Sequence, residues 1–106
     1  MTLREICVAA GVTRRAVQGY EKAGLVSPTG KTSRGYLLYD MNSQERIKMI
    51  RLYQQLGFSI KDIKEIIDAS NDVKRKAIEI RIEKLKEEGE NIESLISRAY
   101  EMLEKL

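Results

Sequence analysis

The chain has 106 residues, of which 42% are hydrophobic, so it has enough apolar residues for one folded core and too few residues for two full-sized domains. It contains no His and a single Cys, which excludes a structural zinc site, His-based catalysis and a disulfide framework. No apolar run approaches the roughly 18 residues that a membrane helix needs. We therefore expect a soluble cytoplasmic protein that is not an enzyme, does not enter a membrane and holds no metal or other cofactor.

The net charge of +3 is unevenly distributed along the chain. Residues 1–40 carry six basic and three acidic side chains, whereas residues 72–106 carry eight basic and nine acidic ones. A polyanionic partner would therefore bind the first third of the chain.

Two short helices are predicted at the start of the chain. Thr2 and Glu5 have the spacing of a capping box, and the helix that they open is expected to end at Gly11. Thr13 is the predicted N-cap of a second helix, which runs from Arg14 to about residue 23. Two short helices joined by a turn that contains glycine are typical of a helix-turn-helix.

The outward side of this second helix carries residue types that suit the major groove of DNA. Arg pairs with guanine and Gln with adenine, each through two hydrogen bonds. The candidate base-reading residues are Arg14, Arg15 and Gln18, and Gly19 and Lys22 share their side of the helix. An ordinary helical pair with a solvated basic face is the alternative that these residues alone leave open.

Residues 25–40 predict a β-hairpin. Two β-prone stretches, 25–26 and 36–39, flank a polar loop with two glycines. The loop carries Lys31 and Arg34 among hydroxyl side chains, all of which can donate hydrogen bonds to phosphate. A helix-turn-helix followed by a basic hairpin describes a winged helix, which we favour over a surface hairpin that is merely made soluble by its charges.

A second pair of helices follows the hairpin. Asn42 and Glu45 have capping-box spacing, Gly57 is expected to end the first helix, and Ser59 with Asp62 is expected to open the next. Residues 69–71 form a predicted linker. The apolar residues expected to face the core are Ile47, Ile50, Leu52, Tyr53, Leu56, Ile60, Ile63, Ile66 and Ile67.

The last 35 residues have a heptad pattern, in which apolar positions alternate between spacings of four and three. The predicted seam consists of Ile78, Ile82, Leu85, Gly89, Ile92, Ile96, Ala99, Leu103 and Leu106. A helix of this length extends about 50 Å, and an apolar stripe that long needs a partner. Gly89 is the midpoint of residues 72–106 and would face its own copy in a symmetric antiparallel pair. We favour that pair over a helix that breaks at Gly89 and folds back on its own domain.

Four blocks of sequence resemble the N-terminal DNA-binding domain of the MerR family of transcriptional regulators. Their order and separation both agree with the family. The blocks are residues 11–13 (Gly-Val-Thr), 20–26 (Tyr-Glu-Lys-Ala-Gly-Leu-Val), 35–40 (Gly-Tyr-Leu-Leu-Tyr-Asp) and 56–63 (Leu-Gly-Phe-Ser-Ile-Lys-Asp-Ile).

The resemblance implies a mainly helical fold with a small β-hairpin wing, in which residues 1–71 form a winged helix-turn-helix and residues 72–106 a dimerisation coiled-coil helix. It also implies a homodimer that binds a pseudo-palindromic site in double-stranded promoter DNA. Such a dimer would distort the DNA so that RNA polymerase can use an over-long spacer between promoter elements. The residues expected to position the DNA backbone are Thr13, Tyr20, Lys22, Lys31 and Arg34.

The sequence departs from the family pattern at several places. Where the family has Arg-Tyr this chain has Gln18 and Gly19, and the family's wing Arg is replaced by Leu37. Tyr36 and Tyr39 are expected to pack in the core or the hairpin. The departures support an alternative function, a coiled-coil protein-interaction or DNA-organising module with weak or lost specific DNA binding.

An effector-sensing segment is not evident in the sequence. Cys7 is the only cysteine, and its place on the apolar side of the first helix predicts a buried structural thiol. Either sensing is absent, or the sequence is part of a longer protein.

Overall fold

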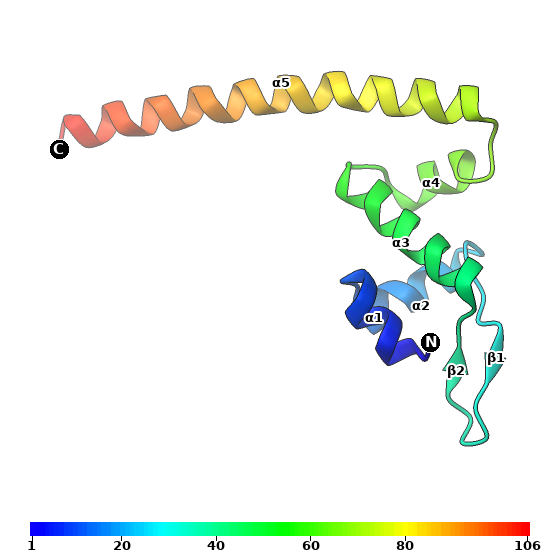
Figure 1. Cartoon of the computed structure of the whole chain (residues 1–106). Helices are drawn as coiled ribbons and strands as arrows, with labels where there is room; N and C mark the ends of the chain where they lie inside the picture. Colours follow the sequence, from blue (N-terminus) through cyan, green and yellow to red (C-terminus); the bar gives the residue numbers. More distant parts are fainter. The chain divides into compact units, whose positions relative to one another are not determined.

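The computed structural model describes residues 1–106, which form two compact units, Met1–Ala69 and Ser70–Leu106. The predicted mainly helical fold with a small wing is confirmed (Figure 1). The first unit contains four helices and a two-stranded antiparallel sheet, and the second contains one helix. The elements are α1 (Leu3–Ala10), α2 (Arg14–Lys22), β1 (Gly30–Lys31), β2 (Leu37–Leu38), α3 (Met41–Gln55), α4 (Ile60–Ile66) and α5 (Asn71–Glu104).

The two helices of the helix-turn-helix begin at the predicted caps. The Thr2 hydroxyl accepts a hydrogen bond from the backbone N–H of Glu5 at 3.3 Å, and the Glu5 carboxylate accepts one from the N–H of Thr2 at 3.1 Å. These bonds lower the pKa of Glu5, because they favour its ionised form. Gly11 ends α1 with a φ of 65°, a left-handed conformation that suits glycine, and Thr13 caps α2 through the N–H of Ala16 at 3.0 Å.

The hairpin lies later in the chain than the sequence predicted. Gly30 pairs with Leu38 and Lys31 with Leu37, so the first strand falls inside the segment expected to be the loop. Residues 25–26 form no strand, and both side chains are buried. The strand prediction for 25–26 was wrong because an apolar run of two residues cannot distinguish a strand from a buried turn.

Helix α3 also begins earlier than expected. Asp40, rather than Asn42, is the N-cap, and its carboxylate accepts from the N–H of Ser43 at 2.9 Å. The N–H of Asp40 donates to the Thr29 hydroxyl at 2.7 Å, and the N–H of Tyr39 donates to the carbonyl of Met1 at 2.7 Å. These bonds hold the chain extended up to Asp40, so the helix starts directly after it.

The core of the first unit is aliphatic with two buried tyrosines, as the composition indicates. One predicted core residue, Leu52, is instead 49% exposed. It lies two positions after Ile50 and one before Tyr53, both buried, and residues two apart on a helix do not share a face. The fully buried side chains are Tyr20, Tyr39, Ile6, Ile47, Ile50, Ile63 and Val17.

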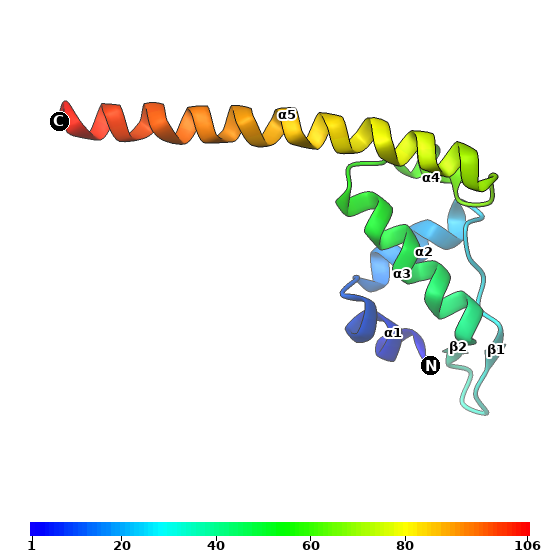
Figure 2. The same cartoon turned by 45° about the horizontal axis from the view of Figure 1, so that its top comes forward.

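The second unit is a single continuous helix of 34 residues, α5 (Figure 2). The Ser70 hydroxyl caps it by accepting from the N–H of Val73 at 3.3 Å. The helix runs through Gly89 without interruption, so the alternative of a break at this glycine was wrong. No residue of α5 is buried, and no helix of the structure combines the length and the apolar content needed to cross a membrane.

Candidate DNA-binding interface

Helix α2 divides cleanly into a buried side and an exposed side. Val17 and Tyr20 are buried and anchor the helix to the core. The exposed side carries the predicted residues Thr13, Arg14, Arg15, Gln18 and Lys22, together with Gly19. The first unit therefore presents three cations and one amide on a single helix, in an arrangement that can approach a polyanion without rearrangement of the core.

Tyr20 lies on the other side of the helix from these residues. Its side chain is 1% exposed, and its hydroxyl donates to Oε1 of Gln54 on α3 at 2.5 Å. Burial raises the pKa of this tyrosine, because the charged form loses hydration. The structure thus places Tyr20 in the core, three residues after Val17 on the same face, and not on the surface where a phosphate contact was expected.

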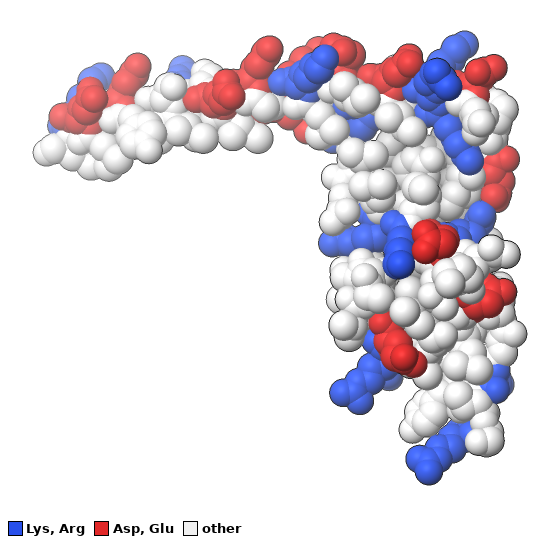
Figure 3. Space-filling model, viewed as in Figure 1, with Lys and Arg blue, Asp and Glu red and all other residues white.

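The wing carries the other two predicted cations, and both are exposed. Lys31 lies in β1, rather than in the loop, and Arg34 lies in the turn between the strands. The turn is held by the Thr32 carbonyl, which accepts from Gly35 at 2.9 Å, and by the Thr32 hydroxyl, which accepts from the N–H of Tyr36 at 3.1 Å. Figure 3 shows the basic atoms at the tip of this hairpin.

One hydrogen bond joins the end of the wing to helix α2. The Tyr39 hydroxyl donates to Oε1 of Glu21 at 2.5 Å. Burial, followed by the adjacent Glu21 carboxylate, raises the pKa of Tyr39 well above its usual range. This bond links the residue that follows β2 to α2 within the first unit.

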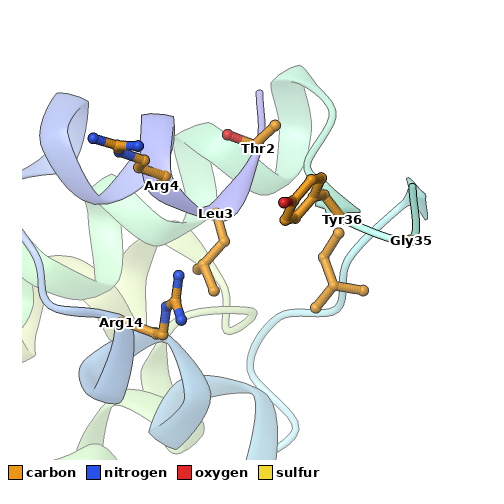
Figure 4. A pocket seen from close by; sticks show the side chains of 7 residues that line it. Thr2, Leu3, Arg4, Arg14, Gly35 and Tyr36 are labelled. Carbon is orange, nitrogen blue, oxygen red and sulfur yellow. The ribbon is translucent and has the colours of Figure 1, made fainter. Parts of the chain in front are cut away.

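A groove of about 660 Å³ lies between the starts of α1 and α2 and the wing. Figure 4 shows Leu3 pointing into it between Arg14 and Tyr36, with Arg4 at its rim. Arg4 and Tyr36, which line this groove, were not among the DNA-binding residues that the sequence predicted. Tyr36 was expected to pack in the hairpin, but its ring is 62% exposed.

A sequence signal for this groove was present but weak. Arg4 belongs to the basic excess of residues 1–40, and Tyr36 follows Gly35, whose φ of 83° marks the end of a turn. Neither feature by itself shows that the two residues lie at one groove, since 31 intervening residues separate them.

The cysteine and the acidic residues form no site of their own. Cys7 is half-buried, which is more exposed than the buried thiol that the sequence predicted. No three His, Cys, Asp or Glu side chains come together in a group that could hold a metal ion.

Comparison with known families and proteins identifies the fold and its function. The family model described as "MerR HTH family regulatory protein" matches residues 1–70, and a second, described as "MerR, DNA binding", matches residues 44–106. The transcriptional regulator CueR of Escherichia coli O6:H1 is 27% identical, over 97% of this chain and 78% of that protein.

Two solved structures have the same fold. A MerR-family regulator from Bacillus cereus is 30% identical, covers 99% of this chain and 81% of its own, and has a TM-score of 0.81. HiNmlR, a MerR-family regulator that lacks the sensor domain and is bound to promoter DNA, is 20% identical, covers 98% of this chain and 78% of its own, and has a TM-score of 0.55. The predicted resemblance is confirmed, and the chain belongs to the MerR family of DNA-binding transcription regulators.

Proposed function

We propose that the protein acts as a cytoplasmic homodimer that binds a pseudo-palindromic promoter site and distorts it for RNA polymerase. The observation that carries the DNA-binding part is that the exposed cations of α2 and of the wing belong to one unit, in which the hydrogen bond between Tyr39 and Glu21 joins the two elements. HiNmlR, which has this fold, is bound to promoter DNA although it lacks a sensor domain. That precedent supports promoter binding by this fold.

Each exposed residue has a role that its chemistry supports. We assign Arg14, Arg15 and Gln18 to base edges, because they lie in the first turns of the recognition helix, where contacts to bases are made. The assigned phosphate contacts are Thr13, Lys22, Lys31 and Arg34, to which we add Arg4 and Tyr36 from the groove.

The dimer part of the proposal rests on α5. We assign residues 1–71 to DNA binding and residues 72–106 to dimerisation. In Figure 3 the charged side chains of α5 gather along one edge of the helix, and uncharged atoms occupy the other. The exposed apolar side chains include Ile82, Ile92, Ile96, Leu103 and Leu106 of the predicted seam, whose other members are Ile78, Leu85, Gly89 and Ala99. A second copy in antiparallel orientation would bury this stripe and set the spacing between two recognition helices.

A change at either arginine of α2 tests the base contacts. Arg14→Ala or Arg15→Ala should cost about 1–3 kcal/mol of binding free energy and relax the preference at one position of each half-site. Selection of bound sites from random DNA by the wild type and by each variant measures both effects. An equal loss on all sequences would reassign the residue to phosphate, and no loss would remove α2 from the interface.

A salt titration distinguishes the proposal from the alternative, a coiled-coil module that recruits a protein. Several phosphate contacts give a steep fall of affinity for generic duplex DNA as salt rises, with a slope of about 0.9 per contact. We expect Lys31→Ala with Arg34→Ala to reduce this slope by about 2. An unchanged slope would leave the wing in solvent, and a wild type with almost no slope would favour the protein-recruiting module.

A further inference from the structure

Gly19 stands in the middle of the recognition helix α2, where no feature of the chain itself requires a glycine. Its φ is not positive, and a Cβ added there would meet no atom within 4 Å. A glycine inside a helix is nevertheless destabilising by about 0.8–1 kcal/mol relative to alanine. The reason for glycine at this position therefore lies outside the folded chain.

A hollow lies over Gly19 on the exposed side of α2. The hollow has a volume of about 460 Å³, and its walls are Arg15, Gln18, Glu21 and Lys22 around Gly19. Arg15 and Gln18 are the residues assigned above to base edges. The hollow is therefore continuous with the base-reading surface, and the inference that follows rests on the proposed function.

The walls carry charges of both signs, because Arg15 and Lys22 are cationic and Glu21 is anionic. The Glu21 carboxylate, which accepts from the Tyr39 hydroxyl, repels a phosphate group. The most prominent uncharged group on the floor of the major groove is the 5-methyl group of thymine. A glutamine can bind adenine through two hydrogen bonds from its side-chain amide. The thymine paired with that adenine then presents its methyl group close to the same part of the helix.

We propose that the hollow over Gly19 receives the 5-methyl group of a thymine, so that Gly19 and Gln18 together select an A·T pair. The absence of a side chain at residue 19 lets the helix backbone approach the base edge, and the stems of Arg15 and Lys22 enclose the methyl group. The Gln-Gly pair at residues 18–19, which departs from the family pattern, then changes what is read and does not abolish reading.

The test uses the wild-type chain and a duplex that carries its selected site, in which each thymine is replaced in turn by deoxyuridine. Deoxyuridine lacks only the methyl group. Burial of one methyl is worth about fourfold in affinity, so the wild type should lose about fourfold at one thymine position of each half-site. Gly19→Ala should bind the thymine site at least fourfold more weakly, and should bind the thymine and deoxyuridine sites equally.

Two controls separate this effect from damage to the fold. Gly19→Ala should raise the midpoint of thermal unfolding, because alanine is the better helix former and its Cβ has free space. Gly30→Ala adds the same methyl in the wing, where its nearest contact is an ordinary one of 3.9 Å, and should keep the discrimination between thymine and deoxyuridine.

Several outcomes would overturn the proposal. A wild type indifferent to every deoxyuridine, or a Gly19→Ala variant with normal affinity and discrimination, would mean that no methyl occupies the hollow. An equal loss by Gly19→Ala on poly(dG-dC), which has no thymine, would indicate a phosphate occupant instead. In each of these cases the wild type still binds DNA with a steep salt dependence; without that dependence the proposed function fails as well.

Discussion

The two units of the chain contain similar helices, but the first unit buries its apolar residues and the second leaves them exposed. In residues 1–69 thirteen hydrophobic side chains are buried among α1 to α4 and the wing, whereas α5 buries none along 34 residues. Both units have hydroxyl N-caps and regular apolar spacing. The difference shows that apolar periodicity predicts which face of a helix needs cover, and only tertiary packing shows whether the same chain supplies it.

The largest effect is expected from breaking the seam of α5. Leu85→Asp with Ile92→Asp places four charges in a dimer interface that would otherwise be dry, because each position occurs twice. Burial of one such side chain contributes about 1.5–3 kcal/mol, so the dimer should dissociate into monomers that retain α1 to α4. Binding to a full site should then weaken, since the second half-site no longer binds as part of the same unit. Sedimentation of the double variant measures the change.

A matched control places the same charges on the other side of the helix. Ile80→Asp with Ser94→Asp lies off the seam and should remain dimeric, although Ile80 is itself an exposed apolar residue. A double seam variant that is still dimeric would contradict the seam as the interface. A wild type that sediments as a monomer would contradict the proposed dimer, on which the recognition of two half-sites depends.

The second prediction compares one isoleucine from each unit. Ile63→Ala in α4 deletes a side chain that is 0% exposed and should lower the free energy of unfolding by about 2–5 kcal/mol. Ile80→Ala in α5 removes a side chain that is 61% exposed and should change it by about 0.5 kcal/mol or less. Denaturant unfolding at one protein concentration measures both. Equal losses would mean that the two units do not differ in burial as described.

The smallest effect is expected from removing one hydroxyl, either from the buried Tyr20 of α2 or from the exposed Tyr36 of the wing. Tyr20→Phe removes the hydroxyl that binds Gln54 and should cost about 1 kcal/mol of unfolding free energy, with unchanged DNA affinity for the folded protein. Tyr36→Phe removes an exposed hydroxyl at the groove and should do the reverse, with weaker DNA binding and unchanged stability. Thermal unfolding and DNA titration of the two variants check this. Weaker DNA binding with unchanged stability for Tyr20→Phe would mean that Tyr20 contacts DNA after all.

Features that depend only on residues close in sequence, such as helix caps, could be predicted. Every cap that was predicted correctly is a hydroxyl bound to an N–H three residues later, as at Thr2, Thr13 and Ser59. Glycines with positive φ end the helices at the expected places, for example Gly57 with a φ of 104°. These features need no information from other parts of the fold, because the bond forms within one turn of the chain.

At the candidate site, the sequence predicted the exposure of the cations correctly and the exposure of two tyrosines wrongly. The exposure of Arg14, Arg15 and Lys22 follows from charge and helical spacing. Tyr20 was expected on the surface and is buried, whereas Tyr36 was expected to be packed and is exposed. A tyrosine has both an apolar ring and a polar hydroxyl, so its burial depends on what packs against it.

The sequence by itself determined the helices, every helix end except the start of α3, the basic first third and the heptad stripe, since periodicity and local hydrogen bonds suffice for these. Only the tertiary structure decided the strand register, the start of α3 at Asp40 and the contacts of Arg46. That guanidinium donates two hydrogen bonds of 2.8 Å to the carboxylate of Asp68, and its Nε donates to the carbonyl of Leu25. Such bonds join residues more than twenty positions apart. No local pattern encodes them, because they form only when packing of the core brings distant segments together.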